Sequence, residues 1–575
     1  MLACDEKNAR FVRDIFTDTQ RLSAPAPILV WQYNLICASR AKMTMSTTAS
    51  DVSHVPVTRH QFLLIFASSF GALLEWYDFY VYAALAGVFG SLFFPSGNET
   101  TAFLASLATF GAGFLVRPLG ALFFGRLGDQ IGRKYTFMAT IVLMGVSTVG
   151  VGLLPSYAKI GIMAPVLLVC LRLLQGFALG GETGGAATYL AEHSPARKRG
   201  FYTSSLQTTA TLGLLASISI VGASRAVMDD TAFQSWGWRV PFLVSTVLLI
   251  VSVYLRTKLA ESPTFQSMKD AGNLSKSPIG ESFGQWGNLK YVLVMLFSTA
   301  SGVGVIFGTG HFYSMYFLQN TLKVAPNTVN LYLAIALIGI FPFYLVFGWL
   351  SDRIGRKWIM MLACLLLALT TQPIFRALTH YANPQLEVFQ KNSPVTVYAD
   401  DCHFSLFSAP KTDCDRIRTF LSASGVSYEQ GAQEAGKPPR TTIGNAEVRG
   451  SDRQALEKAL LTAGWPKHAD PSEIDGPMVI LLIWLLLLYL AMVYGPMAAF
   501  MVELFPARIR YTSLSLPFHL GSGWFGGMLP FVVSAMSVAG GQVYFGLWYP
   551  IVIAAVSLVV GVLFVPETYR RDITQ

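Results

Sequence analysis

Residues 125–134 read GRLGDQIGRK, and residues 348–357 read GWLSDRIGRK. The two stretches share the pattern G-x-L-x-D-x-I-G-R-K, so seven of ten positions match at a separation of 223 residues. The chain around them is largely apolar, because 53% of its residues are hydrophobic and only 13% are charged, against about 25% in ordinary soluble domains. A charged decapeptide that occurs twice in such a chain indicates two equivalent loops of a repeated architecture.

The apolar segments on both sides of each decapeptide are long enough to cross a membrane. The mean hydropathy is +0.48, and runs of more than about 18 apolar residues predict transmembrane helices. The sequence therefore predicts an all-α membrane protein with twelve spans. Their approximate limits are 61–94, 101–124, 135–155, 163–191, 200–223, 239–256, 289–318, 328–349, 358–379, 477–500, 513–537 and 542–565.

The basic residues of the loops set the orientation of these helices. With the N-terminus in the cytoplasm, the inside segments hold eighteen Lys and Arg residues and the short outside segments hold five. Short cytoplasmic loops carry an excess of positive charge, so we expect both termini in the cytoplasm of a bacterial inner membrane. This pattern also explains the net charge of +9 without a nucleic-acid partner.

A second repeat shows where the two halves differ in length. PARKR at 195–199 and PARIR at 506–510 lie 311 residues apart, which is 88 more than the separation of the decapeptides. About that many residues must be inserted before the tenth helix, and the polar stretch 381–475 lies there. The predicted parts are a tail at 1–60, a six-helix half at 61–256, a cytoplasmic loop at 257–288, a second half at 289–380 and 476–566, the insertion at 381–475, and a tail at 567–575. Because residues 1–42 lack a long apolar core and Met43 and Met45 follow, we expect the true start to lie downstream of Met1.

The insertion is expected to form a small α+β domain outside the cytoplasm. Its strand-like runs are VTVYA and SLFS, and residues 415–425 and 452–464 have the pattern of amphipathic helices. Cys402 and Cys414 are its only cysteines, and an oxidising compartment favours a disulfide between them; unpaired thiols are the alternative. The remaining cysteines show no metal-ligand spacing, so no metal site is predicted.

Ionisable residues inside membrane spans are costly, and each is a functional candidate. Asp78 and Arg172 are expected at one level near the midplane, with Glu75 three residues from Asp78 on the same helix face. A nearby arginine keeps a carboxylate ionised, and the loss of that partner raises the pKa of the carboxylate and promotes its protonation. Because alternating access would change these surroundings, Asp78 or Glu75 is a candidate for proton coupling. The alternative is a static ion pair that holds the first and fourth helices together.

Other polar residues of the spans are candidates for gating or for substrate contact. Arg117 and Glu182 are expected at one shallower level, where a structural or gating ion pair is the favoured interpretation. For each aromatic candidate below, the alternative is ordinary helix packing. For each histidine candidate, the alternative is a hydrogen-bonded packing role. The candidates for the substrate cavity are Tyr77, Tyr80, Gln175, His311, Tyr313, Asn320 and His519.

Several motifs resemble those of one known family. They are GALLEWYDFYVY, RPLGALFFGRLGDQIGRK, RLLQGFALGGE, WGWRVPF, AESPTF and ELFPARIRYTSLSLPFHLGSGWFGG. With them the chain, apart from the insertion, resembles the metabolite:proton symporters of the major facilitator superfamily. The resemblance implies two six-helix halves, alternating access and import of a small polar metabolite driven by protons, without a cofactor. The insertion departs from the compact members of that family.

The resemblance also implies a role for the decapeptides. Asp129 is expected to accept hydrogen bonds near helix ends and to pair with Arg133, which ties the halves together when the cytoplasmic side is closed. The alternative is a pair of tight turns, or a topology signal made of positive charge. The residues of this predicted cytoplasmic gate are Gly125, Asp129, Gly132, Arg133, Lys134, Asp352, Gly355, Arg356 and Lys357.

The leading interpretation is a proton-coupled importer of a carboxylate or zwitterion, with the lipid bilayer as its other partner and no protein partner indicated. A uniporter or exporter is the second transport hypothesis, and a membrane receptor that senses ligand through 381–475 is the hypothesis of another class. The sequence has no nucleophile and base at a spacing that would predict an enzyme. The phosphate-binding G-x-x-x-x-G-K-[ST] motif is absent, which argues against an ATP-driven pump.

Overall fold

A computed structural model describes residues 59–94, 99–258, 260–400, 402, 412–432 and 437–573. The chain has two compact units, Met1–Phe62 and Leu63–Gln575, and the description below concerns the second. The proposed false start at 1–42 and the SLFS run of the insertion lie outside the described residues.

The helices of the first half follow the predicted spans, with one break. The helix expected over 61–94 is interrupted at Leu85, where α3 ends and α4 begins. The long helices are α3 (Arg59–Ala84), α5 (Glu99–Gln130), α6 (Arg133–Leu153), α8 (Met163–His193), α9 (Arg199–Val227) and α11 (Val240–Thr257). The shorter ones are α4 (Ala86–Phe93), α7 (Tyr157–Ile160) and α10 (Asp230–Ser235), and α12 (Pro263–Asp270) and α13 (Pro278–Gly284) follow in the central loop.

The second half contains two spans with irregular winding. Span 7, which we define as residues 286–321, combines α14 (Trp286–Met295), α15 (Ser301–Phe307) and α16 (Ser314–Tyr316) with π-helical turns between and after them. Span 11, residues 510–540, joins α23 (Arg510–His519) through the π-helical segment Leu520–Gly527 to α24 (Leu529–Gly540) at a bend of 40°. The regular helices are α17 (Pro326–Ile354), α18 (Lys357–Ala382), α22 (Gly476–Leu504) and α25 (Trp548–Phe564).

These helices account for the twelve predicted spans. Within the described residues, nine helices are long and apolar enough to cross a membrane, and the bent pair of span 11 is a tenth candidate. The helices α3 and α5, with 26 and 32 residues, occupy the first two positions. The fold is therefore the expected all-α membrane fold.

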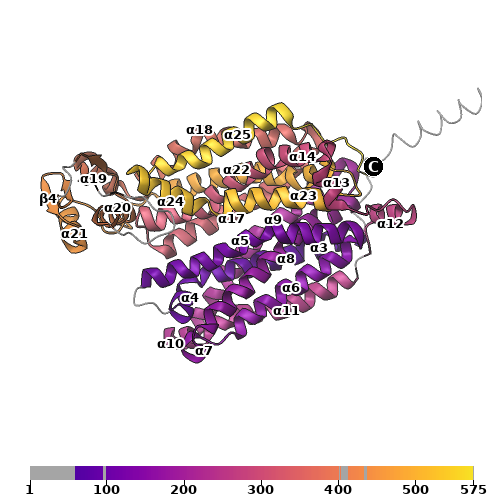
Figure 1. Cartoon of the computed structure of the whole chain (residues 1–575), viewed down its shortest axis with the longest axis horizontal. Helices are drawn as coiled ribbons and strands as arrows, with labels where there is room; N and C mark the ends of the chain where they lie inside the picture. Colours follow the sequence, from indigo (N-terminus) through magenta and orange to yellow (C-terminus); the bar gives the residue numbers. More distant parts are fainter. Residues whose placement is uncertain are drawn as a thin grey trace, which may run out of the picture. The chain divides into compact units, whose positions relative to one another are not determined.

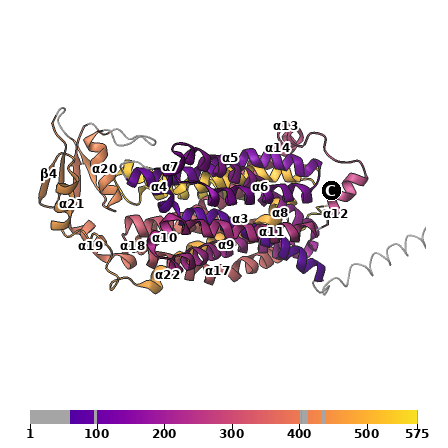
Figure 2. The same cartoon turned by 90° about the horizontal axis from the view of Figure 1, so that it is seen from below.

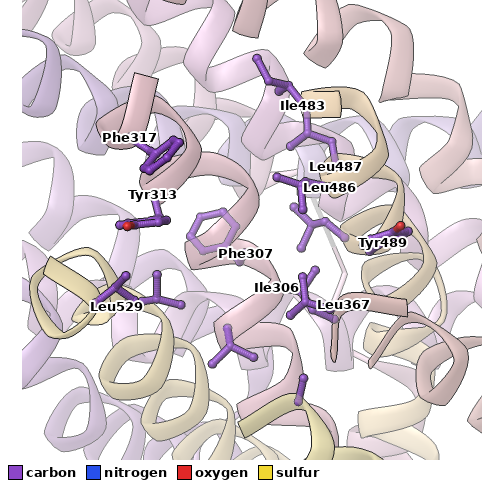
Figure 3. Packing of buried hydrophobic residues seen from close by; sticks show 14 of the residues in the cluster. Ile306, Phe307, Tyr313, Phe317, Leu367, Ile483, Leu486, Leu487, Tyr489 and Leu529 are labelled. Carbon is purple, nitrogen blue, oxygen red and sulfur yellow. The ribbon is translucent and has the colours of Figure 1, made fainter. Parts of the chain in front are cut away.

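The core of the second half is packed around span 7. Phe307 and Tyr313 of this span lie among Leu367 of α18, Leu486 of α22 and Leu529 of α24 (Figure 3). All five side chains are at most 3% exposed. Span 7 is thus enclosed by its own half over much of its length.

The insertion is a four-stranded sheet with helices, as the sequence predicts. Its strands lie in the order β2-β1-β3-β4, with β1 parallel to β2 and antiparallel to β3. Its elements are α19 (Pro384–Asn392), β1 (Val395–Tyr398), α20 (Asp413–Ala423), β2 (Glu429–Gly431), β3 (Arg440–Ile443), β4 (Ala446–Arg449) and α21 (Arg453–Thr462). A disulfide joins Cys402 to Cys414. In both views, α19, α20, α21 and β4 lie at the opposite end of the helices from α12 and α13 (Figures 1 and 2).

Candidate functional site

The first decapeptide carries, at its fifth position, a carboxylate that caps a helix of the other half. Asp129, which is fully buried near the end of α5, accepts hydrogen bonds from the backbone N–H groups of Tyr511 (3.3 Å) and Thr512 (2.9 Å). It also accepts one from the hydroxyl of Thr512, at 2.8 Å. Both donors belong to the first turn of α23, where free N–H groups and the helix dipole favour an anion. Asp129 therefore links the two halves directly.

The second decapeptide repeats this contact in the reverse direction. Asp352 of α17 accepts hydrogen bonds from the backbone N–H groups of Gly200 and Phe201, both at 2.8 Å. These donors lie in the first turn of α9, which belongs to the first half. The two aspartates are therefore equivalent caps that cross the boundary between the halves twice.

An arginine four residues after each aspartate reinforces the cap. Arg133 lies 3.5 Å from the Asp129 carboxylate and donates to the carbonyl of Ala507 at 2.9 Å. Arg356 lies 3.1 Å from Asp352. Both arginine side chains are fully buried, so the positive charge of each must be stabilised by nearby acceptors such as these.

A glutamate in each half completes two matched charge clusters. Glu192 of α8 pairs with Arg510 at 2.7 Å, and Glu503 of α22 pairs with Arg199 at 2.8 Å, both across the halves. Glu503 also binds Arg356 at 2.6 Å. We name Asp129, Arg133, Glu192 and Arg510 the first charge cluster, and Asp352, Arg356, Glu503 and Arg199 the second charge cluster.

The sequence interpretation did not include these glutamates in the gate. Glu192 and Glu503 stand 311 residues apart, at the same separation as the PARKR and PARIR repeats that follow them. Extending the repeat three residues toward the N-terminus gives E-x-x-P-A-R-x-R in both halves. That shared pattern, which ends in Arg199 and Arg510, was the signal that would have identified them.

The last residues of each decapeptide are held by a glutamate that follows the sixth helix of the same half. Glu261 accepts hydrogen bonds from the backbone N–H groups of Arg133 (3.1 Å) and Lys134 (3.2 Å) at the start of α6. Glu567 accepts the equivalent bonds from Arg356 (2.9 Å) and Lys357 (3.1 Å) at the start of α18. Each decapeptide is thus fixed on its own half as well as across the boundary.

Glycines are required at fixed positions of the decapeptides. Gly132 and Gly355 have φ of +137° and +104°, which a residue with a side chain rarely adopts. A Cβ on Gly125 would lie 2.8 Å from the Cα of Thr512 in α23, so a side chain there would push the halves apart. The alternative that the motif is only a positive topology signal does not account for these contacts.

Asp78 and Arg172 lie in one buried polar network, which connects them through the side chains of Thr148 and Gln175. Ser245 of α11 donates to the Asp78 carboxylate at 2.5 Å, and Thr148 of α6 lies beside the same group. Gln175 donates to Thr148 at 2.7 Å and accepts from Arg172 at 2.6 Å. The network therefore joins side chains of four helices, α3, α6, α8 and α11.

Glu182 has a different partner from the one expected. Its carboxylate binds Arg256 of α11 at 2.5 Å and accepts a hydrogen bond from Thr140 at 3.1 Å. Arg117 instead lies over the ring of Phe114, at 4.0 Å. The prediction of an Arg117–Glu182 pair was wrong because depth along the helices gives the level of a residue but not the direction in which it points.

Three acidic side chains line one small pocket within the first half. Glu75, Asp78 and Glu182 contribute to it, together with Ser245 and several apolar side chains of α6 and α11. Glu75 is 4% exposed, and the charged groups around it are Glu182, Arg117, Arg256 and Asp78. The two coupling candidates on α3 therefore face the interior of the first half, beside the Glu182–Arg256 pair.

The candidates for the substrate cavity divide into two groups. Tyr77 donates to the carbonyl of Pro241 at 2.7 Å, and Asn320 donates to the carbonyl of Tyr316 at 3.2 Å, so both bind their own half. Tyr313 packs against Phe375, with ring centroids 5.3 Å apart. Gln175 belongs to the network of Arg172, and His311 packs on Phe307.

Tyr80 and His519 belong to the group that both halves share. Tyr80 and Arg117 come from the first half, and both lie near Tyr494 of α22. His519 of α23 is buried beside Arg117. Tyr344 of α17 lies near Tyr80 and Tyr494, and all these groups are buried between the halves. The sequence analysis missed Tyr344 and Tyr494, because each shares its apolar span with a second tyrosine and the sequence does not show which of the two faces the other half.

The comparisons with known proteins agree with this architecture. Residues 64–285 match the family described as sugar (and other) transporter. The inner membrane metabolite transport protein YhjE of Escherichia coli (strain K12) is 39% identical over 353 residues, which is 60% of this chain and 79% of that protein. The chain belongs to the major facilitator superfamily.

Other relatives of this chain are named for their substrates. The alpha-ketoglutarate permease of Escherichia coli (strain K12) is 36% identical over 57% of this chain and 74% of its own length. The shikimate transporter of the same organism is 36% identical over 58% and 76%. The structure of the proton:xylose symporter XylE bound to 6-bromo-6-deoxy-D-glucose aligns with a TM-score of 0.62 at 16% identity, over 89% of this chain and 98% of that one, and shows the shared fold. The chain is thus a membrane transport protein rather than an enzyme.

Proposed function

We propose that this transporter imports a small carboxylate or zwitterion together with protons across the bacterial inner membrane. The observation that carries the proposal is the buried network of Asp78, Ser245, Thr148, Gln175 and Arg172, which joins a carboxylate to an arginine through side chains of four helices. A carboxylate held in this way changes its affinity for a proton when the surrounding helices move. Relatives named for alpha-ketoglutarate, shikimate, and proline and betaine support the substrate class.

Alternating access requires that the contacts between the halves break and form again. The two charge clusters lie at one end of the helices, and in this structure they connect the halves. We propose that they form the cytoplasmic gate in its closed state, with Lys134 and Lys357 fixing the adjacent turns. Substrate then binds between the halves among Tyr80, Arg117, Tyr344, Tyr494 and His519, where a cation favours a carboxylate.

Uptake into proteoliposomes tests the proposal. Radiolabelled alpha-ketoglutarate, shikimate, proline and glycine betaine are each offered with an imposed pH gradient, alkaline inside. We expect one of them to accumulate above its external concentration and to equilibrate when a protonophore is added. Accumulation of none of them, or uptake that ignores the gradient, contradicts the proposal and favours a uniporter or exporter.

The substitution Asp78→Asn locates the proton site. Asparagine keeps the size of the side chain and a carbonyl acceptor for Ser245, but it cannot bind and release a proton. We expect gradient-driven accumulation to fall to the equilibrium level, while exchange of internal for external substrate continues. If Asp78→Asn accumulates substrate like the native protein, Glu75 becomes the remaining candidate on α3 and is tested in the same way.

A further inference from the structure

The insertion is bonded to the end of span 11 by a buried arginine. Arg418 of α20 is 7% exposed, and its guanidinium donates to the carbonyls of Val538 (3.2 Å) and Ala539 (2.5 Å), in the last turn of α24. The hydroxyl of Tyr428, which accepts from Arg418 at 2.8 Å, donates to the Val538 carbonyl at 2.6 Å. The last carbonyls of a helix lack partners within the helix, so a cation there is stabilised.

The same domain is bonded to the end of span 7. Lys323, two residues after that span, donates to the carbonyl of Ala423 at the end of α20, at 2.7 Å. In return, the backbone N–H of Ala469 donates to the Lys323 carbonyl at 3.2 Å. Asn383 donates to the carbonyl of Leu322 at 2.9 Å. One face of α20 and its following turn therefore contacts both spans.

Apolar packing continues through these contacts. Ile417, Leu421 and Val426 of the insertion are at most 1% exposed, and they belong to the same hydrophobic cluster as Leu322 after span 7 and Val533 of α24. The same cluster extends to first-half residues such as Ala72 and Leu206, so it shows that the insertion packs closely onto the helices, and the hydrogen bonds show to which half. Among the described residues, every hydrogen bond from the insertion to the helices goes to the second half.

The two spans that the insertion holds are those with irregular winding. Span 7 has π-helical turns at Gly308–Tyr313 and Phe317–Thr321, and span 11 has one at Leu520–Gly527. A π-helical turn interrupts the regular hydrogen-bond ladder and marks a place where a helix can rearrange. The contacts of the insertion therefore lie beyond the irregular segment of each span, at Leu322 and Lys323 after span 7 and at Val538 and Ala539 near the end of span 11.

We propose that the insertion is a brace that fixes the ends of spans 7 and 11 to each other. With Arg418 and Lys323 in place, the end of span 7 cannot bend independently of span 11, and both move with the second half. The insertion then sets how readily span 7 closes over the substrate from that end, and it does not act as a plug between the halves.

Hydrogen exchange of the purified full-length protein in detergent, read by mass spectrometry, tests the brace without a substrate. Arg418→Met keeps much of the apolar stem and removes both guanidinium bonds to α24, while the Tyr428 hydroxyl can still donate to Val538. We expect amides of 317–324 and 536–543 to exchange about tenfold faster or more, because local opening loses the bonds that opposed it. Arg416→Met is the matched control on the same helix, since Arg416 is 54% exposed and pairs with Asp413 at the surface.

A second variant changes a residue that follows α24 and leaves the sequence of the insertion intact, so that unfolding of the insertion does not explain the result. Gly541 has φ of +69°, and a Cβ there would lie 2.5 Å from the carbonyl oxygen of Tyr428. Gly541→Ala should accelerate exchange in 317–324 as well as near the substitution, while β1 amides stay protected. Gly272→Ala carries the same φ of +69° with no atom within 4 Å, and it controls for backbone strain alone. Native exchange of 317–324 in both Arg418→Met and Gly541→Ala overturns the proposal.

Discussion

Asp129 and Asp352 each combine two tasks that the sequence pattern does not separate. Each caps the first turn of a helix in the opposite half, and each balances the charge of a fully buried arginine. Removing either carboxylate leaves the helix N-terminus without its anion and takes one of two anions from the arginine, since Glu192 lies 3.8 Å from Arg133 and Glu503 lies 2.6 Å from Arg356. Losing a cap costs about 1 kcal/mol, and the weakened charge balance of a buried arginine adds to that cost.

The first prediction follows from this geometry. Asp129→Ala should favour the conformation in which the halves separate at this end, and Asp352→Ala should do the same because the clusters are equivalent. The measurement is the rate at which N-ethylmaleimide labels Ser515→Cys, a buried position of α23 that faces Gly184 of the other half. We expect labelling to become about fivefold faster or more.

The control for this prediction is Asp270→Ala, which removes a carboxylate that accepts a hydrogen bond from Gln266 on the same short helix. Its labelling rate should equal that of the parent Ser515→Cys protein. Equal rates in Asp129→Ala and the parent would show that the decapeptide forms a tight turn and does not hold the gate.

The Glu182–Arg256 pair gives a second prediction at the residue scale. Glu182→Gln leaves Arg256 buried without its anion, so the thermal unfolding midpoint should fall, in line with a loss of about 3–5 kcal/mol. The double variant Glu182→Gln/Arg256→Met removes the stranded charge and should recover part of that loss. A double variant that is no more stable than Glu182→Gln would contradict a direct pair. Glu447→Gln, which breaks a surface pair with Arg449, should leave the midpoint nearly unchanged.

At the scale of elements, the disulfide closes a short loop of the insertion, between Cys402 and the first turn of α20. Closing a loop of this length stabilises a domain by about 3 kcal/mol through the unfolded chain. Cys402→Ser should therefore let trypsin cut within 412–453 at least tenfold faster under native conditions. Cys170→Ser, which removes an exposed free thiol of α8, should be cut like the native protein; slower or equal cleavage of Cys402→Ser would refute the structural role of the disulfide.

Element-level prediction succeeded where periodicity or repetition carried the information. Long apolar runs identified the spans, and the amphipathic stretch at 452–464 became α21 (Arg453–Thr462). The break at Leu85 and the π-helical turns of span 7 were missed, because they depend on packing between helices and leave no change in apolar pattern. The partner of Glu182 was missed for the same reason, since a sequence gives the order of residues along a helix but not which helix faces which.

At the scale of the whole molecule, the repeat relation was the most informative feature of the sequence. Matched offsets of 223 and 311 residues predicted two halves and an insertion, and the structure adds that the repeated residues meet each other across the boundary. The twofold arrangement of Asp129 on α23 and Asp352 on α9 could be found only once the halves were placed together. The pairing of Glu192 with Arg510 and of Glu503 with Arg199 follows the same exchange.

Orientation in the membrane is the last prediction, and two independent features support one answer. From the excess of Lys and Arg we expect the end with the two charge clusters in the cytoplasm, and the Cys402–Cys414 disulfide favours an oxidising compartment at the other end. A membrane-impermeant maleimide should therefore label Lys467→Cys of the insertion in cells whose outer membrane alone has been made permeable. Lys198→Cys, in the exposed loop before α9, should react only after the inner membrane is also opened. The opposite pattern would place the disulfide in a reducing cytosol and reverse the gate, so that the closed state described above would face away from the cytoplasm.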